Sequence, residues 1–128
     1  MSASFNRAIE EARIGGTDKL SWTCHNDVTI PQEICQLTNL QKLRLSNNQI
    51  TSLPSDFHLL TDLRHLYLCD NRITSLPPDF HLLTNLQELY LDNNPINHID
   101  HQILVQITDI DIPVTVTSQV PVNLPQII

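Results

Sequence analysis

The chain has 128 residues, a length suited to one domain with one hydrophobic core. Its composition is 41% hydrophobic and 16% charged, which excludes an intrinsically disordered chain. The net charge of −7, with only 7 lysines and arginines, argues against nucleic acid and anionic lipid as partners, because both are bound by dense positive charge.

The N-terminal segment, residues 1–16, predicts an amphipathic helix that caps the rest of the chain. Its apolar residues recur at positions i, i+3, i+4 and i+7, namely Phe5, Ala8, Ile9 and Ala12. Ser4 or Asn6 is suited to begin this helix as the N-cap, and the adjacent Gly15 and Gly16 are suited to end it. We therefore expect a short helix that covers the first turn of whatever follows.

A repeat of 23 residues occupies the centre of the chain. Three segments begin at Thr38, Thr61 and Thr84, and they read TNLQKLRLSNNQITSLPSDFHLL, TDLRHLYLCDNRITSLPPDFHLL and TNLQELYLDNNPINHIDHQILVQ. The predicted units are 38–60, 61–83 and 84–106, preceded by a degenerate unit at 17–37. In that unit His25 takes the place of the repeated asparagine and Asp27 the place of an isoleucine, so we expect its path to be irregular.

Each unit predicts one β-strand. The alternation in Leu43-Arg44-Leu45 and in Leu66-Tyr67-Leu68 has a period of two, which places the leucines on one buried face and the residues between them on the other. An asparagine then recurs at the bend after each strand, at Asn48, Asn71 and Asn94. Stacked coils would arrange these amides as a ladder that hydrogen-bonds otherwise unpaired backbone groups.

These repeats resemble the leucine-rich-repeat family, specifically the intracellular type whose repeat is LxxLxLxxNxIxxLPxxFxxL. The resemblance covers about residues 17–106. It implies an α/β fold: a short solenoid of about four coils, with parallel strands on the concave face and a helical cap at the N-terminus. It also implies a protein–protein interaction module and scaffold that is not an enzyme, because family members that are enzymes generally carry catalysis in a separate domain.

The C-terminal segment, residues 107–128, is rich in Ile, Val and Thr but is interrupted by three prolines. We expect it to form a C-terminal cap or an extended tail. Two alternatives stay open: a strand exchanged with a second copy of the chain, and a disordered extension used for binding or export. The first would make the protein a weak homodimer, or a structural, self-associating protein, instead of a monomer.

The outward positions of the predicted strands form columns on the concave face, where solenoids usually bind partners. The columns are Lys19, Lys42, His65 and Glu88; then Ser21, Arg44, Tyr67 and Tyr90; then Thr23, Ser46, Cys69 and Asp92. Our candidate partner-binding residues are Lys42, Arg44, His65, Tyr67, Asp70, Glu88, Tyr90 and Asp92. Tyrosine and arginine are enriched at the energetic centres of interfaces, although β-propensity alone could explain the two tyrosines.

Other chemistry is predicted to be absent. The two glycines are adjacent, so no loop for a nucleotide phosphate is present. Two histidine pairs have spacings that could serve a metal, His58 with His81 and His98 with His101, but the first follows from the repetition and the second has no further ligand of defined spacing. We expect no metal and no cofactor.

The cysteines predict neither disulfides nor catalysis. Cys24, Cys35 and Cys69 are odd in number and form no CxxC pair, which favours a reducing compartment. A nucleophilic Cys24 or Cys69 combined with His25 or His65 is the enzymatic alternative, but the sequence indicates no activating arrangement.

The expected location is the cytoplasm, without membrane insertion. No secretory signal or long apolar stretch is evident in the sequence. Similar repeats occur in eukaryotic signalling scaffolds and in effector proteins that intracellular bacteria inject into host cells. The high content of Asn, Ile and Gln favours the second group, which would involve translocation without a cleavable signal peptide.

Overall fold

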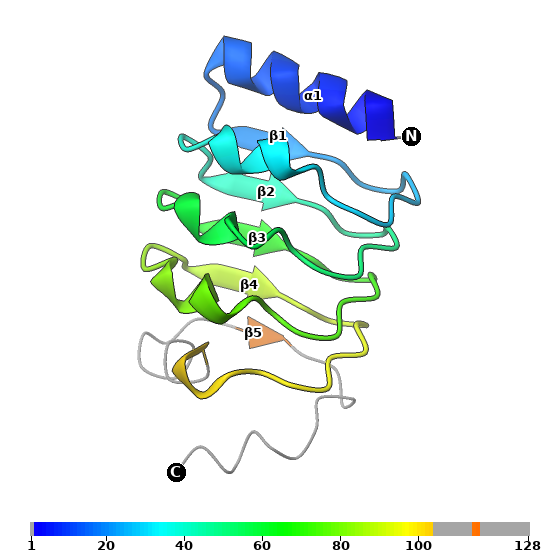
Figure 1. The fold of residues 1–128 in the computed structure, drawn as a ribbon, viewed down its shortest axis with the longest axis vertical. Coiled ribbons are helices and arrows are strands. Elements are labelled where there is room, and N and C mark those ends of the chain that lie inside the picture. The colour runs from blue at the N-terminus through cyan, green and yellow to red at the C-terminus, as the bar shows by residue number, and fades with distance from the viewer. Residues whose placement is uncertain (1, 104–113, 116–128) are drawn as a thin grey trace.

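The computed structural model describes residues 2–103 and 114–115, and it forms a stack of coils beside one parallel sheet (Figure 1). Helix α1 (Ser2–Gly15) lies across the N-terminal end of the stack. The strands follow in chain order as β1 (Lys19–Ser21), β2 (Lys42–Arg44), β3 (His65–Tyr67), β4 (Glu88–Tyr90) and β5 (Val114–Thr115). Short 3₁₀ helices at Gln32–Gln36, Phe57–Leu59 and Pro78–Leu82 carry the chain back after β1, β2 and β3.

The strands pair in the register that the 23-residue period predicts. Leu43 of β2 pairs with Leu20 of β1 on one side and with Leu66 of β3 on the other, and Leu66 pairs with Leu89 of β4. The central leucines of β2, β3 and β4 are buried, while the residues on either side of each face outward. The expected alternation and the parallel solenoid are therefore confirmed.

A ladder of buried asparagines ties successive coils together. Asn48, Asn71 and Asn94 are between 0% and 7% exposed. Asn71 illustrates the pattern, because its Oδ1 accepts a hydrogen bond from the Ile50 N–H (3.1 Å) and its Nδ2 donates to the Leu45 carbonyl (3.0 Å), both in the preceding coil. These asparagines therefore serve the scaffold, as the sequence predicts.

The core consists of the same apolar positions repeated from coil to coil. Phe57 and Phe80 are both fully buried, and their rings lie parallel with centroids 6.4 Å apart. Isoleucines take the equivalent position in the first and fourth coils, Ile34 and Ile103, and both are also fully buried. No coil can cover its own apolar face, so each is stabilised by its neighbours.

Helix α1 covers the first coil through one apolar face. Phe5, Ile9 and Ala12 are buried, and the Phe5 ring stacks on Trp22 with centroids 4.9 Å apart. The helix begins at Ser2, so Ser4 lies inside it and does not act as the predicted N-cap. Its C-terminal end lies at the predicted pair of glycines, although only Gly16 lies beyond the helix.

That end is a Schellman turn centred on Gly16. Gly16 adopts φ +62°, its N–H donates to the Arg13 carbonyl, and the Thr17 N–H donates to the Ala12 carbonyl. This conformation is costly for residues that carry a Cβ, which explains glycine at position 16. Gly15, in contrast, belongs to the helix itself.

The two glycines should therefore respond to alanine with opposite signs. We expect Gly16→Ala to lower the free energy of unfolding by about 1 kcal/mol, because alanine is strained in the left-handed conformation. Gly15→Ala should raise it by about 0.5–1 kcal/mol, because alanine is the better helix former. A Cβ at either position meets no atom within 4 Å, so packing does not obscure the comparison. Urea unfolding followed by circular dichroism measures both, and equal signs would contradict the assignment.

The first coil departs from the regular path less than its sequence predicts. The N–H groups of His25 and Asp27 both donate to Asn48 Oδ1, so the asparagine of the next coil organises this bend. Asp27 is 3% exposed at the isoleucine position, and its carboxylate accepts a hydrogen bond from the Trp22 indole N–H (2.5 Å). The His25 ring stacks on the other partner of that bond, Trp22, with centroids 3.7 Å apart. The bend also contains two residues with a left-handed backbone. Cys24 is equivalent to Asn47 in the next coil, whereas Asn26 has no such counterpart.

The sheet continues beyond the four strands that the sequence predicts. Val114 and Thr115 form β5, which pairs in parallel with Leu89 and Tyr90 of β4. The rest of segment 107–128, and with it the predicted cap or tail, lies outside the described residues. Within the described part, none of the helices has the length and apolar character needed to cross a membrane.

Candidate functional site

The candidate site is the concave face, which we define as the outward side chains of β1 to β4. Strand register places six of the eight predicted residues side by side on this face. Lys42, His65 and Glu88 form one column across three strands, and Arg44, Tyr67 and Tyr90 form the next. Because neighbouring parallel strands lie about 4.8 Å apart, residues paired in register are direct neighbours.

The second column forms a continuous stack of three side chains. The rings of Tyr67 and Tyr90 are nearly parallel, with centroids 4.9 Å apart and 14° between their planes. The Arg44 guanidinium carbon lies 5.1 Å from the centroid of the Tyr67 ring, within range of a cation–π interaction. The stack holds all three side chains in place while leaving Arg44 exposed and the tyrosines partly exposed.

Glu88 joins the two columns. Its Oε1 lies 2.9 Å from His65 Nδ1 and accepts a hydrogen bond from the Tyr67 hydroxyl at 3.2 Å. Partial burial raises the pKa of the Tyr67 phenol, and the hydrogen bond to the Glu88 carboxylate raises it further. Tyr67 therefore remains a neutral hydrogen-bond donor throughout the physiological pH range.

The other two predicted residues lie at the edge of the concave face. Asp70 occupies the turn after β3 with φ 59°, and its Oδ1 accepts a hydrogen bond from Asn93 Nδ2 (2.8 Å). Asp92 follows β4 in the third column and is partly buried. Its Oδ1 is buried without a hydrogen-bond partner among the described residues. These two carboxylates are not part of the stack of Arg44, Tyr67 and Tyr90.

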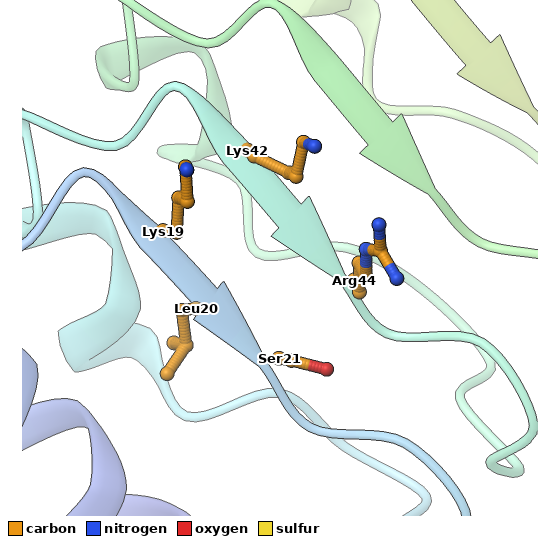
Figure 2. Close-up of a pocket in the computed structure, with 5 residues that line it drawn as sticks. All are labelled: Lys19, Leu20, Ser21, Lys42 and Arg44. Carbon is orange, nitrogen blue, oxygen red and sulfur yellow. The ribbon is translucent and has the colours of Figure 1, made fainter.

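A hollow of about 410 Å³ lies at the β1 side of the face (Figure 2). It is lined by Lys19, Leu20, Ser21, Lys42 and Arg44. The sequence argument placed Lys19 and Ser21 in the outward columns but did not select them as partner-binding residues. The available signal was the occurrence of the chain's two lysines in the same column.

Of the three cysteines, Cys35 and Cys69 have thiols with raised pKa values. Burial raises the pKa of the Cys69 thiol, and burial raises that of Cys35 to about 11, so neither is activated as a thiolate nucleophile. His65, the histidine considered as a base for Cys69, contacts Glu88 through Nδ1 and makes no hydrogen bond to Cys69 among the described residues. Cys24 is exposed in the turn after β1.

The histidine pairs are likewise used within the fold. Nδ1 of His58 contacts the Ser55 carbonyl at 3.2 Å, and Nδ1 of His81 contacts the Pro78 carbonyl at 2.9 Å. His98 Nε2 lies 2.8 Å from a carboxylate oxygen of Asp100. In the part of the chain that the structure describes, three or more His, Cys, Asp or Glu side chains do not gather as they would around a metal ion.

Comparison with protein families matches a model described as leucine rich repeat to three overlapping stretches, residues 19–73, 38–96 and 61–111. Comparison with curated protein sequences gives no match. Among solved structures, a leucine-rich-repeat protein of Leptospira interrogans has a TM-score of 0.56 and 27% sequence identity, over 87% of this chain and 33% of that one.

The leucine-rich-repeat domain of a Shigella effector is a second structural neighbour. It has a TM-score of 0.60 and 24% identity, over 76% of this chain and 40% of that one. At 24% identity the likeness to the Shigella domain concerns the fold alone. This chain spans a third of the length of the first neighbour and two-fifths of the length of the second.

Proposed function

Because the chain belongs to the leucine-rich-repeat family, we propose that it is a protein-recognition module that contacts a protein partner through its concave face. Leucine-rich-repeat domains are generally protein-interaction modules, and solenoids present extended surfaces for this purpose. The observation that carries the proposal is the stack of Arg44, Tyr67 and Tyr90 at the centre of that face.

The composition of the stack suits a protein interface. Tyrosine and arginine combine a large apolar contact area with polar groups, and they dominate the energetic centres of measured interfaces. Here the side chains are also held before any partner arrives, Tyr67 between Arg44 and Tyr90 and by its hydrogen bond to Glu88. Less side-chain freedom is then lost on binding, which favours affinity.

The charges around the stack make the concave face positive at β2 and negative at β4. Lys42 and Arg44 lie on β2, and Glu88 lies on β4. A partner with the opposite polarity would be oriented by these charges, because complementary charge mainly controls association rate and specificity. We place Lys42, Arg44, His65, Tyr67, Glu88 and Tyr90 at the centre of the contact, with Asp70 and Asp92 at its rim.

The size of the face limits the affinity. Four strands at about 4.8 Å span roughly 15 Å between the outer strands, which is narrow for a standard interface of about 800 Å² per partner. We infer weak binding unless the edges of the solenoid also contribute.

Catalysis is not part of the proposal. The leucine-rich-repeat fold is typically a non-enzymatic interaction scaffold, and the raised pKa values of Cys35 and Cys69 are the opposite of what a nucleophile needs. The partner that we propose is a protein, with neither nucleic acid nor lipid as the main ligand, because the chain carries a net charge of −7.

Two further predictions are not adopted as functions. Self-association through segment 107–128 stays a prediction, because β5 pairs with β4 within one chain and an exchange of β5 between two copies would use the same pairing. Action in a host cell after translocation, like that of an injected bacterial effector, stays a prediction, because the likeness to the Shigella domain concerns the fold.

The test is quantitative capture of partners by the wild-type chain and by the double variant Tyr67→Ala/Tyr90→Ala. We expect the variant to bind its specifically captured protein about 10–100-fold more weakly, because both aromatic anchors are lost. Isothermal titration with the purified partner measures the change, after circular dichroism has established that the variant is folded.

Two control variants make the result specific. Tyr67→Phe/Tyr90→Phe keeps the stacked rings, so it should retain most of the affinity. Leu59→Ala/Leu82→Ala removes apolar side chains that are 47% and 44% exposed on the return segments, and it should have no effect. If the two alanine pairs weakened binding equally, or neither did, the concave face would not be the site.

A further inference from the structure

We propose that the hollow between β1 and β2 binds an extended acidic segment of the protein partner, with carboxylates spaced two residues apart. This inference rests on the proposed function and specifies the chemistry of the partner. It starts from an uneven distribution of charge. Three of the chain's 7 lysines and arginines line this one hollow, in a protein whose net charge is −7.

The three cations are free to bind a ligand. In the described part of the chain, the ion pairs are those of Arg13 with Glu10, His65 with Glu88 and His98 with Asp100. Lys19, Lys42 and Arg44 take part in none of these pairs. Arg44 is positioned instead by the ring of Tyr67, an interaction that leaves the guanidinium N–H groups available.

The spacing of the groups matches an extended peptide. Lys19 pairs in register with Lys42, and Ser21 with Arg44, so the four side chains start from the corners of a rectangle of about 5 by 7 Å. An extended peptide places alternate side chains on one face about 6.6 Å apart. Two glutamates at positions i and i+2 of a segment that runs along β2 would therefore face Lys42 and Arg44, and Figure 2 shows these side chains and Lys19 beside the hollow.

The surroundings favour a short acidic segment over nucleic acid. A phosphate backbone requires positive charge that continues along its length. Here the positive charge ends after two strands, because the first column continues with His65 and Glu88 and the third ends in Asp92. The Tyr67–Tyr90 stack begins where the cations end, so one segment could contact both the hollow and the proposed aromatic centre.

The first measurement is an NMR titration of the isotope-labelled chain with a peptide of alternating glutamate and serine. The matched control peptide carries glutamine in place of glutamate. We expect shifts at the amides of Lys19–Ser21 and Lys42–Arg44, with a dissociation constant on the order of 1 mM that weakens as salt rises from about 0.05 M to about 0.5 M. The glutamine peptide should cause no such shifts, and equal shifts with both peptides would overturn the proposal.

Charge-matched variants test the assignment. Lys19→Gln/Lys42→Gln should weaken binding of the acidic peptide about tenfold. Arg7→Gln/Arg72→Gln also removes two positive charges, but at exposed positions away from the hollow, and it should leave the affinity within about twofold. Equal weakening by the two variants would show a general effect of net charge and would overturn the site.

Two other ligands distinguish the source of the anion. Inorganic phosphate should bind more weakly than the peptide and should not displace it, and a single-stranded oligonucleotide should not bind more tightly than the peptide. The reverse result with either ligand would overturn the proposal. If the tyrosine variants weaken partner binding but the acidic peptide causes no shifts, only the acidic-segment proposal fails. If partner binding survives the tyrosine variants, the proposed function itself fails.

Discussion

Replacing Asn71 with alanine is expected to lower the free energy of unfolding by about 3 kcal/mol, a large fraction of the stability of a small domain. The amide lies between the coils that begin with β2 and β3. Its Oδ1 accepts from the Ile50 N–H, and its Nδ2 donates to the carbonyls of Leu45 and Leu68. A single substitution therefore removes hydrogen bonds on both sides of the junction between two coils.

The hydrogen bonds lost in Asn71→Ala contribute unequally to the free energy of unfolding. The carbonyl of Leu45 also accepts from Asn48, and the carbonyl of Leu68 also accepts from Asn94, so both keep a partner in the variant. The Ile50 N–H keeps none of the ladder's bonds, and an unsatisfied buried donor costs about 1–3 kcal/mol. The expected loss of about 3 kcal/mol therefore combines about 2 kcal/mol for that donor with about 0.5 kcal/mol for each bond lost at the Leu45 and Leu68 carbonyls, which keep a partner.

Urea unfolding measures the effect, with circular dichroism reporting all coils and the fluorescence of Trp22 reporting the first. Asn39→Ala is the matched control, because Asn39 is exposed, and it should change the free energy of unfolding by less than about 0.5 kcal/mol. A loss below about 1 kcal/mol in Asn71→Ala would mean that water or a relaxed backbone satisfies the Ile50 donor.

Most of the scaffold could be predicted from the sequence because each coil repeats the same strand register and the same buried positions. The period of 23 residues predicts which residues pair across strands, and the leucine and asparagine positions predict burial and the ladder. The exception is the first coil, where Asp27 replaces an isoleucine. The sequence alone does not indicate that the indole of Trp22 would hydrogen-bond this buried carboxylate, since that pairing depends on tertiary packing.

The sequence predicts which residues of the candidate site share a column on the concave face, but it does not predict which of their side chains are in contact. Register alone brings Tyr67 beside Tyr90, and the structure adds that Glu88 bonds both His65 and Tyr67. Whether two outward side chains touch depends on their rotamers, which the period does not determine. Asp70 lies at the edge of the face for a different reason, because it occupies the turn after β3 with a left-handed backbone and accepts a hydrogen bond from Asn93.

The second large effect is expected for Phe57→Ala, which should lower the free energy of unfolding by about 3–5 kcal/mol. Phe57 is fully buried in a central coil, and its ring stacks against Phe80 in the next coil. Removing the ring leaves a cavity that neighbouring side chains, already close-packed, fill only in part. Phe57→Ile should cost only about 1–2 kcal/mol, because Ile34 and Ile103 occupy the equivalent position in other coils.

The position of the substituted coil in the stack determines which other coils are destabilised. In a stack where each coil contacts only its neighbours, a defect in the second of four coils weakens the contacts on both of its sides. The transitions followed by circular dichroism and by Trp22 fluorescence should therefore shift together in Phe57→Ala. In Ile103→Ala the defect lies in the fourth coil, so the dichroism transition should shift more than that of Trp22. If Phe57→Ala instead separated the two transitions while Ile103→Ala moved them together, the solenoid would be stabilised from its C-terminal end and not through its central coils.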